Sequence, residues 1–135
     1  MTGGRRGAVS RARADWFRRS RATVTDLLAV DEDGAPLCWV SMGPYRDEHS
    51  ATVSGVSEVY ALYAEPDRIG TGVGRLLIEA VHTRVEHRTR LWVLAGNTRA
   101  RRFYERAGYR ADGAERLDDY GGPVLTELRY ERTAG

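Results

Sequence analysis

The chain has 135 residues, enough for one domain that buries its own core, and its single cysteine, Cys38, excludes an internal disulfide. The sequence offers no apolar run of about 18 residues for a transmembrane helix, and with the lone cysteine this leads us to expect a cytoplasmic protein. The formal net charge of +2 conceals an asymmetry, because residues 1–21 hold seven arginines and one acid whereas the remaining 14 arginines face 18 acids.

The first predicted element is an arginine-rich helical segment at residues 1–23, ahead of a single domain at residues 24–135. Trp16 and Phe17 recur at helical spacing after Ala12. A basic segment on an acidic body can serve as a nucleic-acid arm, but this one lacks the interleaved aromatic residues of a stacking surface. We therefore expect a solvated segment and do not expect a nucleic-acid partner.

Three strands are predicted next. Residues 23–30 and 35–43 form a hairpin around an acidic Asp-Glu-Asp-Gly turn, and residues 44–50 form a polar loop. Residues 54–64 are almost continuously apolar, which is typical of a central strand covered on both faces. Pro66 then ends this strand, because proline cannot donate to the ladder of a sheet.

Helices and strands alternate in the second half of the chain. Apolar residues recur at spacings of three and four over residues 72–85, which predicts an amphipathic helix of about four turns. Residues 90–96 are a strand, and residues 97–108 are a second helix whose first residues can cap it. Residues 109–122 and 123–132 form the last two strands. This order predicts an α/β fold with one parallel crossover inside a mixed sheet.

Three glycines, Gly70, Gly72 and Gly74, lie between the long strand and the first of these helices. The first amides of a helix lack internal acceptors, and glycine lets an anion approach them closely, so the pattern predicts a phosphate site. A Walker loop is excluded because Arg75 and Leu76 follow Gly74, and a dinucleotide fingerprint would need glycine at position 75. A tight turn with helix-packing glycines is the alternative.

Two blocks, EVYALYAEPDRIGTGVGRLLIEA and LWVLAGNTRARRFYERAGY, together resemble the GNAT N-acetyltransferase superfamily over about residues 24 to 131. The glycines of the family's Gln/Arg-x-x-Gly-x-Gly/Ala loop fall on Gly72 and Gly74, while Ile69 replaces its Gln/Arg, which leaves no side-chain contact to carry over from that position. The resemblance implies a three-layer α/β fold. Only about 23 residues precede the first strong strand, so we expect the family's usual first strand to be missing.

The resemblance also implies that acetyl-CoA is the cosubstrate, held where two strands splay apart. The pantetheine arm would pair with the backbone of Leu62, Tyr63 and Ala64, and Asn97 would hydrogen-bond it. Backbone amides of the glycine loop would hold the pyrophosphate. The loop residues implied are Gly70, Thr71, Gly72, Val73, Gly74 and Arg75.

Two side chains are candidates for the chemistry. Tyr104, which follows a Phe103 expected to face the core, can donate a proton to the departing thiolate, or it can be a half-buried core aromatic. Glu58 can take a proton from the amine, because a carboxylate in an apolar strand is costly unless it faces a cleft, or it can lie at a solvated strand start. The three histidines lack metal-ligand spacing, so we expect no metal site.

The expected activity is N-acetyl transfer from acetyl-CoA to a primary amine by direct attack. The alternative is a non-catalytic acyl-CoA-binding or regulatory domain. Because an amine arrives as a cation, we expect a small cationic amine or a peptide amino group bound by acidic side chains. The acids proposed are Glu58, Asp47, Glu48, Asp118 and Asp119.

We also expect a homodimer, since a sheet without its first strand would leave a bare edge at residues 25–30.

Overall fold

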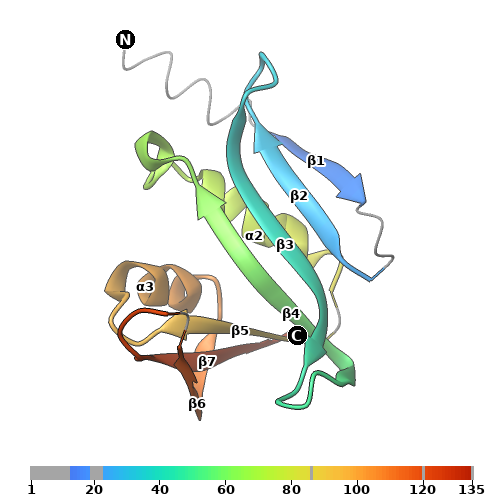
Figure 1. The fold of residues 1–135 in the computed structure, drawn as a ribbon. Coiled ribbons are helices and arrows are strands. Elements are labelled where there is room, and N and C mark those ends of the chain that lie inside the picture. Colours follow the sequence, from blue (N-terminus) through green and yellow to red (C-terminus); the bar gives the residue numbers. More distant parts are fainter. Residues whose placement is uncertain (1–12, 19–22, 86, 120, 135) are drawn as a thin grey trace. The chain divides into compact units, whose positions relative to one another are not determined.

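The computed structural model describes residues 13–18, 23–85, 87–119 and 121–134 (Figure 1). Seven strands, two α-helices and one short 3-10 turn occur in these residues. The chain divides into two compact units. The first consists of Met1–Pro44 and Val59–Val85, and the second of Tyr45–Glu58 and Glu86–Gly135.

The first unit contains the N-terminal strands, in the order β1-β2-β3-β4. These strands are β1 (Arg13–Arg18), β2 (Thr25–Val30), β3 (Pro36–Arg46) and β4 (Thr52–Ala64), of which β3 and β4 continue into the second unit. β2 pairs antiparallel with β1 and with β3, so that Leu27 lies opposite Val40. Both of these side chains are fully buried, as expected for β-branched and aliphatic residues in the middle of a sheet.

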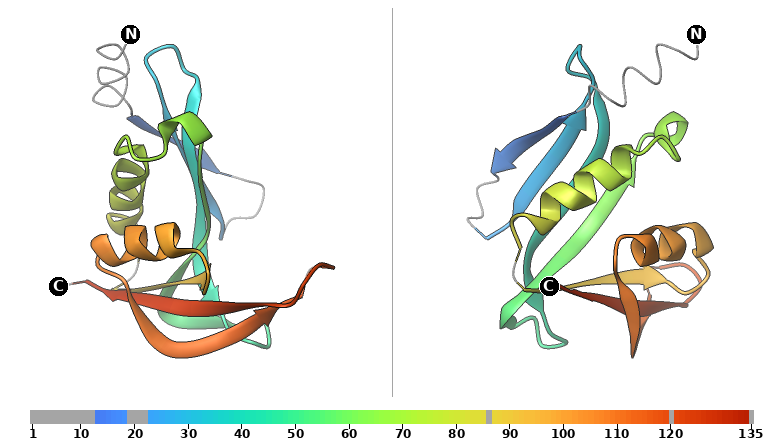
Figure 2. Two further views of the ribbon diagram at one scale, coloured as in Figure 1. Left: turned by 90° about the vertical axis from the view of Figure 1, so that its left-hand side faces the viewer. Right: turned by 180° about the vertical axis from the view of Figure 1, so that it is seen from behind.

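Helix α2 (Val73–His82) covers one face of these strands and lies over β1 and β2 (Figure 2). Its apolar stripe consists of Val73, Leu77, Ile78 and Val81, all buried. The helix is shorter than the four turns predicted. The Thr83 hydroxyl donates to the carbonyl oxygen of Ala80, and Thr83 forms the C-cap.

The N-terminal segment differs from its prediction. Residues 13–18, expected to be helical, form a strand, and the remainder of the expected helix lies outside the described residues. The helical spacing was misleading because backbone pairing with the edge of β2 satisfies these amides better than an isolated short helix does. The sheet thus has a strand ahead of β2, so the expectations of a missing first strand and of a bare β2 edge were wrong. The division of the chain at residue 23, and a homodimer, stay predictions.

The second unit has the strand order β4-β5-β7-β6. β5 (Arg88–Leu94) and β6 (Arg110–Asp118) both pair antiparallel with β7 (Leu125–Thr133). Residues alternate strictly between the two faces of β5, and those on one face are buried. These buried residues are Thr89, Leu91 and Val93, with Tyr130 of β7 opposite Leu91.

Helix α3 (Thr98–Arg106) belongs to this second unit and is joined to β7 by a hydrogen bond from Tyr130 to Glu105. Asn97 caps its start, as one of the first residues was predicted to do, and Gly108 follows its end with φ +99°, which favours glycine. The predicted loop at residues 44–50 is shorter, because β3 continues to Arg46. Neither α-helix, among the residues described, has the length and apolar character needed to cross a membrane.

Candidate functional site

The glycine turn precedes α2 in the first unit. Gly70 and Gly72 have φ values of +83° and +92°, a region that side chains with a Cβ disfavour. A methyl group added at Gly70 would meet no atom within 4 Å, so backbone conformation rather than space requires glycine. The Thr71 hydroxyl and amide both turn back to the carbonyl oxygen of Arg68, which tightens the turn.

The N-terminus of α2 has no side-chain cap, because its N-cap residue is Gly72. The amides that begin the helix, those of Val73, Gly74 and Arg75, have no acceptor within the helix, and the helix dipole adds partial positive charge there. The Arg75 guanidinium donates to Glu79 at 2.8 Å, one turn along the helix. The turn therefore offers backbone donors to an anion.

Two side chains just before the glycine turn, those of Ile69 and Arg68, bear on anion binding there. Ile69 is 46% exposed and stands where the resemblance would place Gln or Arg. Arg68, one residue earlier, has a buried Nη1 with no hydrogen-bond partner in the described part of the chain. A buried guanidinium nitrogen without an acceptor is costly, and an anion bound at the turn is one acceptor that would satisfy it.

The end of β4 carries the three residues expected to meet the pantetheine arm. Tyr63 is 53% exposed, whereas Leu62 and Ala64 are half-buried. Directly after them, Glu65 donates its amide to Leu37 and Pro66 begins the 3-10 turn Pro66–Arg68.

Glu58 lies in the second unit and is 8% exposed, so the alternative of a solvated strand start is wrong. The amide of Arg46 donates to its Oε1 at 3.3 Å. Burial raises the pKa of Glu58, and the Glu127 charge adds to this rise, while the Arg46 hydrogen bond and the charges of Arg116 and Arg46 oppose it. A carboxylate with a raised pKa is a stronger base than an exposed one.

Asn97 and Tyr104 occupy the two ends of α3. The Asn97 Oδ1 accepts from the amide of Ala100 at 3.1 Å, so the cap uses the oxygen and leaves the side-chain amide group to donate. Tyr104 is 9% exposed and meets Phe103 and Tyr109 edge to face, with ring centroids 5.3 and 5.8 Å apart. Phe103, expected to face the core, is only half-buried, so Tyr104 takes the core position instead.

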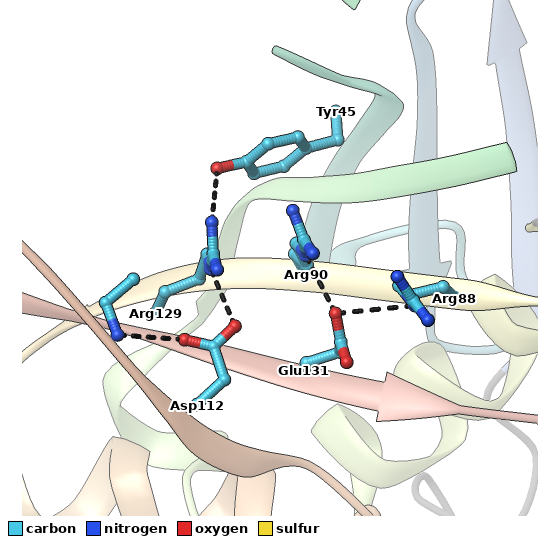
Figure 3. A network of polar contacts seen from close by, with 7 residues as sticks. Tyr45, Arg88, Arg90, Asp112, Arg129 and Glu131 are labelled. Carbon is cyan, nitrogen blue, oxygen red and sulfur yellow. Dashed lines mark hydrogen bonds and ion pairs between the residues drawn. The ribbon is translucent and has the colours of Figure 1, made fainter. Parts of the chain in front are cut away.

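The second unit carries a partly buried ion-paired network that was not predicted from the sequence (Figure 3). Arg129 bridges Asp112 at 2.6 Å and the Tyr45 hydroxyl at 3.2 Å. Glu131 accepts from Arg90 at 2.8 Å and pairs with Arg88 at 3.6 Å. The sequence signal was the spacing by two of Arg88 and Arg90 in β5 and of Glu127, Arg129 and Glu131 in β7, which could be interpreted only once the strand pairing was known.

A second pair in this unit lies next to Trp92. Arg116 donates to Glu127 at 2.7 Å and stacks over the Trp92 ring at 4.4 Å from its centroid. The charges that act on Glu58 include two arginines, Arg116 and Arg46. The surroundings of Glu58 therefore differ from the acidic site expected for the acceptor amine.

The loop acids expected to bind the acceptor have other surroundings. Asp47 accepts from the amides of His49 and Ala51 and so builds its own turn. Glu48 is exposed and pairs with His49 at 3.6 Å. Asp118 is half-buried and Asp119 is exposed. A common acceptor site for these residues stays a prediction.

The described residues contain neither a metal-ligand cluster nor an exposed thiol. Within the described ranges, no three His, Cys, Asp or Glu side chains could hold a metal ion. Cys38 is buried, and burial raises the pKa of its thiol to about 11, so it remains a neutral packing residue at physiological pH.

The profile of the acetyltransferase (GNAT) family matches residues 5–109 of the chain. The chain belongs to the GNAT acetyltransferase family. It is 31% identical over 111 residues to the peptidyl-lysine N-acetyltransferase YjaB of Salmonella typhimurium, which covers 82% of this chain and 75% of that protein. The family resemblance read from the two sequence blocks is thus confirmed, and the chain is an acyltransferase by family.

Solved structures support the same fold. A GCN5-related N-acetyltransferase from Kribbella flavida superimposes with a TM-score of 0.67 at 20% identity, covering 95% of this chain and 86% of that one. The PaiA N-acetyltransferase from Thermoplasma acidophilum, in complex with coenzyme A, gives 0.62 at 19% identity, covering 84% and 63%. The α/β class with a mixed sheet is confirmed.

Proposed function

We propose that this protein transfers the acetyl group of acetyl-CoA to the side-chain amine of a peptidyl lysine. The observation that carries the proposal is the uncapped N-terminus of α2 behind two left-handed glycines, in a chain that belongs to the GNAT family. A relative named for peptidyl-lysine acetylation supports the acceptor class.

The residues of the glycine turn fit the pyrophosphate of the coenzyme. The amides at the start of α2 would supply donors, and a glycine N-cap places no side chain of its own between them and the anion. The unpaired Nη1 of Arg68 adds a charged donor close in sequence to the turn. PaiA, which shares the fold, binds coenzyme A in its crystal structure.

We assign the pantetheine arm to two further groups. The backbone of Leu62–Ala64, at the end of β4, would exchange hydrogen bonds with its amides. The side-chain amide of Asn97 would donate to it, because the oxygen of this side chain is already used by the helix cap.

The reaction needs an unprotonated amine. A lysine side chain has a pKa of about 10.4 and arrives as a cation, so one proton must leave before attack. Glu58 would accept this proton, directly or through water. The amine nitrogen then attacks the thioester carbon and the C–N bond forms. As the C–S bond breaks, the nitrogen releases a second proton, and the coenzyme leaves as a thiolate that takes up one proton.

Tyr104 would stabilise or protonate that thiolate with its hydroxyl. Its ring is fixed by edge-to-face contacts with Phe103 and Tyr109, which limits the directions in which the hydroxyl can point. Fixed orientation of a donor is what general acid catalysis requires.

The test is an acceptor screen with acetyl-CoA. Lysine-containing peptides, small polyamines and anionic amines are incubated with the protein, free thiol is followed with a thiol reagent, and the products are analysed by mass spectrometry. We expect a mass gain of one acetyl group on lysine side chains. Tight coenzyme binding without turnover on any amine would instead support a non-catalytic acyl-CoA-binding domain.

A further inference from the structure

Arg101 makes two hydrogen bonds that join three elements of the second unit. Its Nε donates to the Tyr130 hydroxyl of β7 at 2.9 Å, and its Nη1 donates to the carbonyl oxygen of Ala95 at 2.9 Å. Ala95 is the first residue after β5, and Arg101 itself lies on α3. One side chain thus connects the end of β5 with α3 and β7.

The Tyr130 end of this connection is rigid. Tyr130 is fully buried, and its hydroxyl donates to the Glu105 carboxylate at 2.8 Å while it accepts from Arg101. The guanidinium is therefore held by a buried hydroxyl that is itself fixed by a carboxylate on the same helix. The hydrogen bond to Tyr130 is also the largest cause of a raised pKa of Arg101.

The Ala95 end lies in the turn that presents Asn97. The amide of Ala95 donates to Thr126 of β7, and the amide of Asn97 donates to Leu94. The residue between them, Gly96, has no side chain to pack, and a methyl group there would meet nothing within 4 Å. Arg101 therefore supplies a side-chain hydrogen bond to a turn whose central residue has no side chain.

We propose that Arg101 is a positioning residue that fixes the Ala95–Asn97 turn and thereby orients the Asn97 side chain toward the coenzyme. This inference rests on the proposed role of Asn97 in binding the pantetheine arm. Arg101 acts through Asn97 and touches neither substrate.

The geometry requires arginine at this position. Two donors of one planar group reach two acceptors on different elements, and a lysine ammonium on its flexible stem cannot reproduce that fork. Arginine also stays charged at every accessible pH, so this brace does not titrate in the range where Glu58 does.

The test compares Arg101→Gln and Arg101→Lys with Arg102→Gln. Arg102 is the next residue on α3 and is exposed, so its variant matches the change of charge without touching the turn. Thermal melts first establish that each variant is folded. Amide hydrogen exchange at Ala100, whose N–H is capped by Asn97, then reports the turn in the absence of any ligand.

We expect both Arg101 variants to speed exchange at Ala100 and to weaken coenzyme A binding roughly three- to tenfold, the effect of about one hydrogen bond. The KM for acetyl-CoA should rise while kcat at saturation stays within about twofold. Arg102→Gln should change neither exchange nor affinity. Wild-type affinity in Arg101→Lys, or unchanged exchange at Ala100 in Arg101→Gln, would overturn the proposal.

A double variant decides whether the effect passes through Asn97. If it does, Arg101→Gln should weaken coenzyme binding much less in an Asn97→Ala background than in the wild type. Full additivity would contradict the inference. A wild-type protein that binds no coenzyme A would contradict the proposed function instead, and the exchange measurement would still decide the role of Arg101 in the turn.

Discussion

The two α-helices of this protein begin in opposite ways. α2 starts behind Gly72, which has no side chain to cap it, whereas α3 starts behind Asn97, whose Oδ1 accepts from the Ala100 amide. Every helix N-terminus carries donors without internal acceptors. Asn97 satisfies one of these donors in α3 with its side chain, whereas Gly72 has no side chain that could do the same in α2.

The difference separates two kinds of function. An open helix N-terminus binds charge without regard to shape, which suits a pyrophosphate. A capped and braced one holds a single side chain in a fixed orientation, which suits a directional hydrogen bond to an amide of the pantetheine arm. Substitutions that block the N-terminus of α2, or that remove the cap of α3, should therefore affect different steps.

Closing the terminus of α2 should have the largest effect. In Gly74→Asp, a carboxylate in the first turn adds bulk and negative charge where phosphate should bind, so we expect coenzyme A affinity to fall by at least about tenfold. The same carboxylate interacts favourably with the helix dipole, so the melting temperature should stay the same or rise. Calorimetry measures the affinity.

Gly122→Asp is the matched control for this change. Gly122 has no atom within 4 Å of where a Cβ would stand and belongs to the second unit, so its variant adds the same charge outside the glycine turn. An affinity for Gly74→Asp within about threefold of wild type would mean that the turn is not the pyrophosphate site.

Removing the Tyr104 hydroxyl comes next in size. Tyr104→Phe keeps the two edge-to-face ring contacts. General acid catalysis contributes roughly 10²- to 10⁴-fold, so we expect kcat to fall at least about tenfold with coenzyme affinity little changed. Tyr109→Phe, in the neighbouring buried ring, serves as the control. An unaltered kcat in single-turnover measurements would leave Tyr104 as a packing residue.

The pH dependence of kcat/KM should report the ionisation of Glu58. A base must be deprotonated, and the pKa of Glu58 lies above the usual value for a glutamate, so kcat/KM should fall as the pH drops through that raised pKa. Arg116→Gln removes a positive charge and should move this limb to higher pH, whereas Glu127→Gln should move it to lower pH. Shifts in the same direction would contradict the electrostatic assignment.

The same shift has a consequence for stability. The folded-state pKa of Glu58 exceeds its unfolded value, so ionisation of this carboxyl costs more free energy in the folded protein than in the unfolded one. The stability contributed by the protonated carboxyl is present below the unfolded pKa and is lost as the pH rises through the folded pKa. Glu58→Gln should therefore keep or raise the melting temperature at pH 7 while it lowers kcat. A fall in both the melting temperature and kcat would indicate a structural role for Glu58.

The elements that local patterns encode were predictable from the sequence. The three- and four-residue spacing of Val73, Leu76, Leu77, Ala80 and Val81 located α2, and the first residues of the next helical segment, Asn97 and Thr98, were predicted as alternative caps, of which Asn97 is the cap of α3. β1 was mistaken for helix because its state is set by pairing with β2, which no local spacing reveals.

Long-range neighbours also decided what was missed at the candidate site. The two arginines that act on Glu58, Arg46 and Arg116, lie on β3 and β6, which are separate from β4 in the sequence. The brace from Arg101 to Tyr130 spans 29 residues, and in the sequence Arg101 is one arginine among several on a basic helix. Pairings of this kind become visible only when strand order and register are known.

The smallest expected effect separates the two uses of Asn97. Asn97→Ser keeps an oxygen that can accept from Ala100, so the free energy of unfolding should change by less than about 0.5 kcal/mol, whereas Asn97→Ala removes the cap and should cost about 1 kcal/mol. Neither variant retains the side-chain amide that would donate to the pantetheine arm. Both should therefore raise the KM for acetyl-CoA by a similar factor, roughly three- to tenfold for one lost hydrogen bond, despite their different stabilities. Denaturant unfolding and steady-state kinetics on the same preparations measure the two quantities. A KM that follows stability, normal in the serine variant and raised only in the alanine variant, would show that Asn97 serves the helix alone and that both helix termini differ only in how they are capped.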